Sequence, residues 1–224
     1  MTVLLVLAMF SIFILIDYVV NRGKQPALAP AYAPKPKALP IEDEFVAGFR
    51  TPKDVRYHPG HAWLARERSN FARVGIDEFA AALAGKIEKI ELPKPGQWIR
   101  QGQRALAVLR NGEKVELVSP IEGEVVEINP EVVANPALVR SDPYGRGWLM
   151  TVHVPDEEST ARNLVPTGLV RNWMRDAAER LYALQPQLAG ATMPDGGRPA
   201  EDLLAGVAEV PWKETAARFF LTAA

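Results

Sequence analysis

The chain has 224 residues and contains no cysteine. That absence excludes disulfides, thiolate zinc sites, cysteine-ligated iron–sulfur clusters and covalently attached c-type haem. The chain also has no excess of charge of either sign, since 26 Lys and Arg face 27 Asp and Glu, a formal net charge of −1. Without a broad basic field it is poorly suited to nucleic acid, so we expect no nucleic-acid partner.

Residues for catalysis are equally scarce. The only histidines are His58, His61 and His153, and no glycine-rich phosphate loop or nucleophile elbow is present. A Pro-Gly pair separates His58 from His61, which favours a turn over a metal site. We therefore expect no catalytic residue and no metal, and a protein that is not an enzyme.

A long apolar run opens the chain, and residues 1–20 read MTVLLVLAMFSIFILIDYVV. As a helix, Val3 to Val20 would be about 27 Å long, close to a hydrocarbon core of about 30 Å. No side-chain cation precedes the run, whereas Arg22 and Lys24 follow it. This asymmetry predicts a single-pass anchor over residues 1–21 in the inner membrane, with the rest of the chain facing the cytoplasm. A cleaved signal peptide is the alternative.

Composition divides the remainder into three parts. Residues 22–48 are rich in proline, which favours an extended linker. Residues 49–185 have the composition of a folded domain. Residues 186–224 begin with a Gly/Pro loop and end in a tail.

Short runs with β-branched or alternating apolar residues dominate residues 49–185 and predict strands. These runs are Ala62 to Arg66, Phe71 to Ile76, Lys86 to Leu92, Arg104 to Leu109, Lys114 to Val118, Gly123 to Ile128 and Trp148 to Val154. Helical patterns occupy Asp77 to Leu83 and Leu169 to Tyr182. The predicted fold class is mainly β with peripheral helices.

Several segments resemble the glycine cleavage system H protein in nearly that family's order and spacing. They are Tyr57 with His61-Ala62-Trp63, Val74-Gly75-Ile76-Asp77, Glu91-Leu92-Pro93, Ser119-Pro120 through Glu127-Ile128-Asn129, and Ser141-Asp142-Pro143-Tyr144-Gly145 through Trp148-Leu149. The resemblance covers about residues 55–184. It implies a flattened β-barrel sandwich of the lipoyl type with flanking helices, here preceded by one transmembrane helix.

In the family that the chain resembles, a lysine at a hairpin tip carries lipoate. The matching position lies ten residues after Gly102 and eight before Pro120, and it is occupied here by Gly112. Asn111-Gly112 is a strong signal for a two-residue hairpin turn. We therefore expect the turn without the cofactor. Lys114 is the only nearby amine, and a shifted lipoyl site there is the alternative.

The tail carries large apolar residues in a helical pattern. Trp212, Phe219 and Phe220 are the aromatic ones, and we expect them to dock on a partner or on the bilayer. Docking of the same helix on the chain's own domain is the alternative.

These features favour a non-enzymatic docking subunit of a larger membrane-bound complex. Its partners would be the bilayer, through residues 1–21, and other protein subunits. A photosynthetic or respiratory complex is a plausible host, since one span followed by a cytoplasmic β-rich domain also resembles the layout of the H subunit of purple-type reaction centres. Two alternatives stay open: a lipoyl carrier modified at Lys114, and a membrane recruiter of soluble enzymes that recognise H proteins.

Overall fold

The computed structural model describes Met9, Leu15 and residues 43–156, 160–184, 202–204 and 211–223. The predicted anchor therefore lies outside the described residues, apart from Met9 and Leu15, which are helical and exposed. Within the described ranges, no helix has the length and apolar character needed to cross a bilayer. Residues 40–224 form one compact unit.

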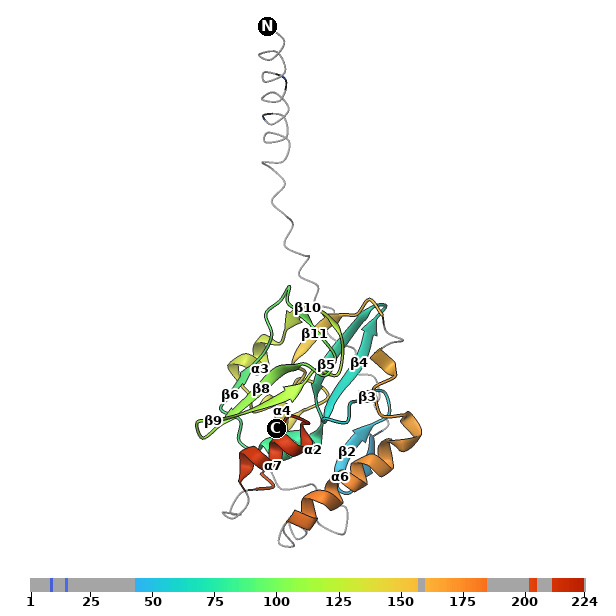
Figure 1. Cartoon of the computed structure of the whole chain (residues 1–224), viewed down its shortest axis with the longest axis vertical. Helices are drawn as coiled ribbons and strands as arrows, with labels where there is room; N and C mark the ends of the chain where they lie inside the picture. Colours follow the sequence, from blue (N-terminus) through green and yellow to red (C-terminus); the bar gives the residue numbers. More distant parts are fainter. Residues whose placement is uncertain are drawn as a thin grey trace. The chain divides into compact units, whose positions relative to one another are not determined.

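The domain is built from antiparallel sheets (Figure 1). The larger sheet has the order β3-β4-β5-β11-β10-β7. Its strands are β3 (Arg56–Tyr57), β4 (Ala62–Arg68), β5 (Phe71–Ile76), β11 (Met150–His153), β10 (Gly123–Ile128) and β7 (Trp98–Ile99). A three-stranded sheet has the order β6-β8-β9, from β6 (Lys89–Glu91), β8 (Arg104–Arg110) and β9 (Glu113–Val118). The predicted mainly β fold is confirmed.

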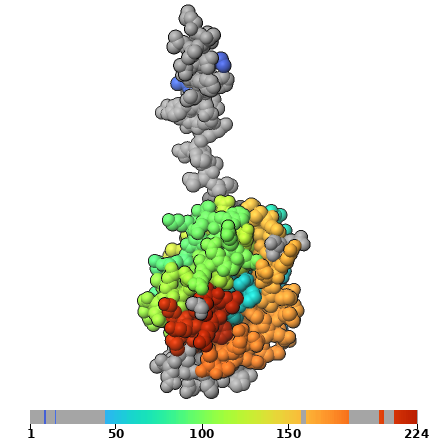
Figure 2. All heavy atoms as spheres, viewed as in Figure 1, coloured from blue at the N-terminus to red at the C-terminus, as the bar shows by residue number. Residues whose placement is uncertain are grey.

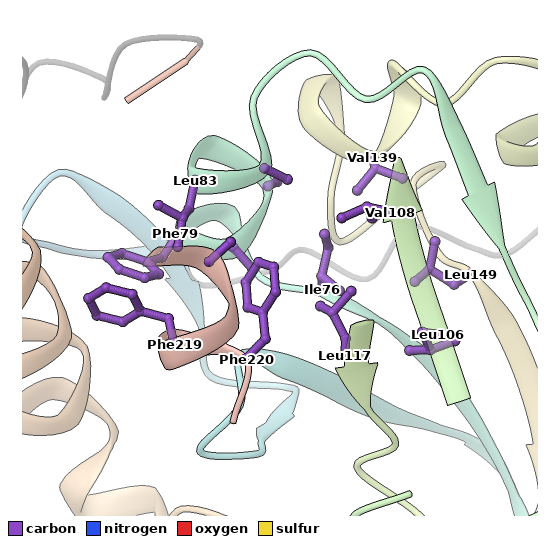
Figure 3. Close-up of a cluster of buried hydrophobic side chains, with 14 of the residues drawn as sticks. Ile76, Phe79, Leu83, Leu106, Val108, Leu117, Val139, Leu149, Phe219 and Phe220 are labelled. Atoms are coloured by element: carbon purple, nitrogen blue, oxygen red, sulfur yellow. The ribbon is translucent and has the colours of Figure 1, made fainter. Parts of the chain in front are cut away.

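Apolar residues two positions apart on β8 and on β9 share the face that encloses the core. Leu106 and Val108 on β8, with Val115 and Leu117 on β9, are buried, because successive side chains of a strand point to opposite faces. Figure 3 shows Leu106, Val108 and Leu117 in one cluster with Leu149, which directly precedes β11.

A hairpin that the sequence did not predict lies before the first predicted strand. β1 (Asp43–Val46) pairs with β2 (Phe49–Pro52) across Ala47 and Gly48, which have φ values of 51° and 86°. Two positive φ angles are the signature of a type I′ turn. The predicted linker over residues 22–48 is therefore too long, because Asp43–Val46 form a strand of this hairpin and Ala47 and Gly48 form its turn.

Two helices lie close to where the sequence placed them. α2 (Glu78–Ala84) is capped by Asp77, whose Oδ1 accepts a hydrogen bond from the amide of Ala80 at 2.7 Å. The 3-10 turn η1 (Thr167–Leu169) leads into α6 (Val170–Leu184). Two short helices, α3 (Pro130–Ala134) and α4 (Leu138–Ser141), complete the connection from β10 to β11.

The C-terminal helix α7 (Trp212–Phe219) corrects the expectation of docking on a partner. Its Trp212 indole N–H donates to the carbonyl of Leu83 at 3.1 Å, and the ring of Phe219 lies 5.1 Å from that of Phe79. Phe220 has no exposed surface. Figure 2 shows residues 211–223, in red, packed into the surface of the domain, and Figure 3 shows Phe219 and Phe220 inside the core cluster.

The physical reason is the nature of the surface that α7 covers. Five of the seven residues of α2 are alanine or leucine, so the surface of this helix is largely apolar. Burying that face against Trp212, Phe219 and Phe220 removes a large apolar area from solvent. The three aromatic side chains are thus committed to the chain's own core.

Candidate functional site

The hairpin β8–β9 is the candidate site that the sequence singles out. Arg110 faces Glu113 across the turn, and Leu109 faces Lys114. Asn111 and Gly112 have φ values of 50° and 77°. The predicted two-residue turn is therefore present, with the left-handed backbone that an Asn-Gly pair adopts readily.

Gly112 stands in open space at the tip of this hairpin. A Cβ atom added to it would meet no heavy atom within 4 Å. A side chain at this position would therefore extend into solvent. Glycine presents neither an amine nor a nucleophile, so position 112 offers no atom to which an acyl group could be attached.

Lys114 on β9 forms an ion pair with a residue of β6, two strands away in the same sheet. Its Nζ lies 2.7 Å from Oε2 of Glu91 on β6. This hydrogen bond raises the pKa of the Lys114 ammonium and lowers the pKa of the Glu91 carboxyl. Acyl transfer to lysine needs the neutral amine, and a raised pKa makes that form rarer at neutral pH.

The hairpin is tied at its tip end to the C-terminal segment. The Arg110 guanidinium pairs with Asp202 at 2.7 Å, with only 14% and 20% of the two side chains exposed. The same guanidinium lies 5.7 Å from the ring centroid of Trp212. Further along β9, the hydroxyl of Thr222 donates to the carbonyl of Glu116 at 3.0 Å.

This connection is not predicted from the sequence. Arg110 and Asp202 are 92 residues apart, and neither belongs to a motif that would indicate a pair. The closest signal was the aromatic pattern of the tail, which identifies an amphipathic helix but not the surface that receives it.

His58 and His61 are both buried inside the domain. His61 is buried between the rings of Phe79 and Trp173, at 4.4 and 4.6 Å, and its Nδ1 lies 2.8 Å from Oδ2 of Asp77. Burial, with a smaller contribution from His61, lowers the pKa of His58 to about 4. Within the described part of the chain, no three His, Cys, Asp or Glu side chains gather as a metal site would require.

Comparison with known proteins gives one consistent result. The family model for the glycine cleavage H-protein matches residues 55–176. The H protein of Mycobacterium leprae (strain Br4923) is 36% identical over 105 residues, which cover 47% of this chain and 80% of that protein. The H protein of Carboxydothermus hydrogenoformans is 37% identical over 115 residues, or 51% and 88% of the two chains.

One solved structure is also similar to this chain. The crystal structure of a glycine cleavage system H protein from Mycobacterium marinum is 31% identical and covers 47% of this chain and 87% of that one, with a TM-score of 0.44. Hairpin β1–β2 precedes the residues that the family model matches, and α7 follows them.

Proposed function

The chain belongs to the glycine cleavage H-protein family, and we propose that it is a non-enzymatic member that keeps the fold of a carrier without carrying lipoate. The observation that supports this proposal is Gly112 at the open tip of hairpin β8–β9. In the family the lipoyl group is attached through a lysine amine at this place. Here the tip has the required exposure but no amine.

The surroundings of the hairpin support a static role. Lys114 is held by Glu91, and Arg110 is held by Asp202 from the C-terminal segment. The Arg110–Asp202 pair is largely buried and hydrogen-bonded, so it fixes the position of the groups that it joins, whereas the exposed Lys114–Glu91 pair adds little. A hairpin fixed in this way suits a surface that other proteins recognise.

The role that we propose is a docking subunit of a membrane-bound complex. The supporting feature is the apolar run in residues 1–21, followed by Arg22 and Lys24, which favours a single span with the domain on the cytoplasmic side. The partners would be protein subunits of that complex, with a photosynthetic or respiratory assembly as the plausible host.

The first test is modification by a lipoate ligase. The full chain and the variants Gly112→Lys and Lys114→Arg would be incubated with ligase, ATP and lipoate, and their intact masses measured. We expect no added mass on the unaltered chain or on Lys114→Arg, and one lipoyl group on Gly112→Lys, which restores an amine at the tip.

Gly112→Lys also serves as the positive control, because its modification shows that the ligase recognises this domain. A lipoyl group on the unaltered chain that disappears in Lys114→Arg would contradict the proposal and identify Lys114 as a carrier. The same mass measurement on protein from its native membrane extends the test to the cell.

The second test concerns the partners. The full chain, purified from its native membrane in mild detergent, should bring other membrane subunits with it in fixed stoichiometry. A chain that lacks residues 1–21 is the control for the role of the anchor. Recovery of soluble H-protein-binding enzymes instead of membrane subunits would replace the docking role with recruitment.

A further inference from the structure

A cavity of about 340 Å³ lies on the side of the domain formed by hairpin β1–β2 and the start of α6. Its apolar lining comes from Val46, Pro52, Val55, Tyr57 and Val170. The volume is at the lower end of the roughly 300–1,000 Å³ that is typical of small-molecule sites. Val46 and Pro52 precede the residues matched by the family model, so this side of the cavity lies outside the matched part of the chain.

Charged groups stand around this apolar lining, and cations outnumber anions. Lys53, Arg171 and Glu44 all contribute to the cavity. Nε of Arg171 lies 3.1 Å from Oε1 of Glu44, and the two side chains are 62% and 32% exposed. An exposed ion pair of this kind is weak, so Arg171 can exchange Glu44 for another anion at low energetic cost.

The start of a helix adds further positive character. Thr167 and Gly168 line the cavity and open the turn η1, which runs directly into the 15 residues of α6. Pro166 precedes the turn and supplies no side-chain cap. The amides of Leu169 and Val170 already donate to the carbonyls of Pro166 and Thr167, so the helix contributes its dipole, which favours a negative charge at this end.

From this combination we infer that the cavity binds a small organic carboxylate with a short apolar body, such as a fatty acid of medium length. Val170, which is partly exposed, would contact the hydrocarbon, and the nearly buried Val46, Val55 and Tyr57 would form the floor beneath it. Arg171 would bind the carboxylate in place of Glu44. This inference is independent of lipoate and of the membrane anchor, because neither contributes to the cavity.

The test uses 6,6,6-trifluorohexanoate, followed by fluorine NMR as it is titrated into the full chain in detergent. The chain itself supplies the variants: Arg171→Gln removes the cation, Glu44→Gln frees it, and Arg175→Gln makes the same charge change one turn further along α6, outside the cavity lining. The amide 6,6,6-trifluorohexanamide serves as the uncharged probe.

We expect saturable binding to the unaltered chain, weakened at least about tenfold by Arg171→Gln. Glu44→Gln should strengthen binding, because it removes a competing carboxylate, and Arg175→Gln should leave it unchanged. The amide should bind more weakly than the acid. Because Arg171 and Glu44 form only an exposed pair, all variants should melt at the temperature of the unaltered chain.

Opposite effects of Glu44→Gln and Arg171→Gln are the decisive result. Partition into the detergent would produce broadening that does not saturate and is equal in every variant, which would overturn the inference. Equal weakening by Arg171→Gln and Arg175→Gln would also overturn it, since only the general charge of α6 would then matter.

Discussion

Replacing Phe220 by alanine tests whether the C-terminal segment belongs to the core of the domain. Phe220 has no exposed surface and follows α7 directly, next to Phe219 and its contact with Phe79. Removing a fully buried phenylalanine side chain costs about 3–5 kcal/mol, from the lost transfer free energy and the cavity left behind. Domains have a total stability of about 5–15 kcal/mol, so this loss is large.

In a domain of this size each kcal/mol lowers the melting temperature by about 2–4 °C. Phe220→Ala should therefore lower it by roughly 6–20 °C, as measured by calorimetry or circular dichroism. Phe45→Ala is the matched control, because it removes the same atoms from a side chain that is 49% exposed. Its expected cost is about 1 kcal/mol.

Equal melting temperatures for Phe220→Ala and the unaltered chain would refute this reasoning. Trp212, Phe219 and Phe220 would then be free to contact a partner, and the docking role of the tail would be restored. A large fall for Phe220→Ala with a small one for Phe45→Ala would establish α7 as part of the chain's own core.

Four further predictions concern the hairpin tip, His58, the Lys114–Glu91 pair and the membrane topology. Gly112→Lys should stay folded and lose about 1 kcal/mol in urea unfolding, because lysine is strained at a φ of 77°. His58 has a pKa lowered to about 4, so unfolding takes up a proton; stability should be complete above about pH 6.5, fall towards pH 4, and fall less in His58→Asn. Lys114→Gln should raise the pKa of the Glu91 carboxyl in an NMR titration, because it removes the hydrogen bond that lowers it. An alkaline phosphatase fused after Ala224 should be inactive if the domain is cytoplasmic, and strong activity would reverse the orientation.

The sequence by itself determined the features that depend on neighbours along the chain. Alternating apolar residues indicated the strands, and Asn111-Gly112 indicated the type I′ turn, because a strand or a two-residue turn is specified by a few adjacent side chains and φ angles. The ordered motifs around Trp63, Pro120 and Tyr144 indicated the family. The glycine at the tip was readable for the same reason, since it is a single position in a short hairpin.

Only the tertiary structure decided what the amphipathic elements bury. The pattern of Trp212 and Phe219 identifies an apolar face but contains no information about the surface that covers it, and α2 supplies that surface from more than 120 residues away. The cavity between β1–β2 and α6 arises in the same way, from segments brought together by packing. Burial of apolar area is non-directional, so the partner of an apolar face is set by which other faces the fold leaves uncovered.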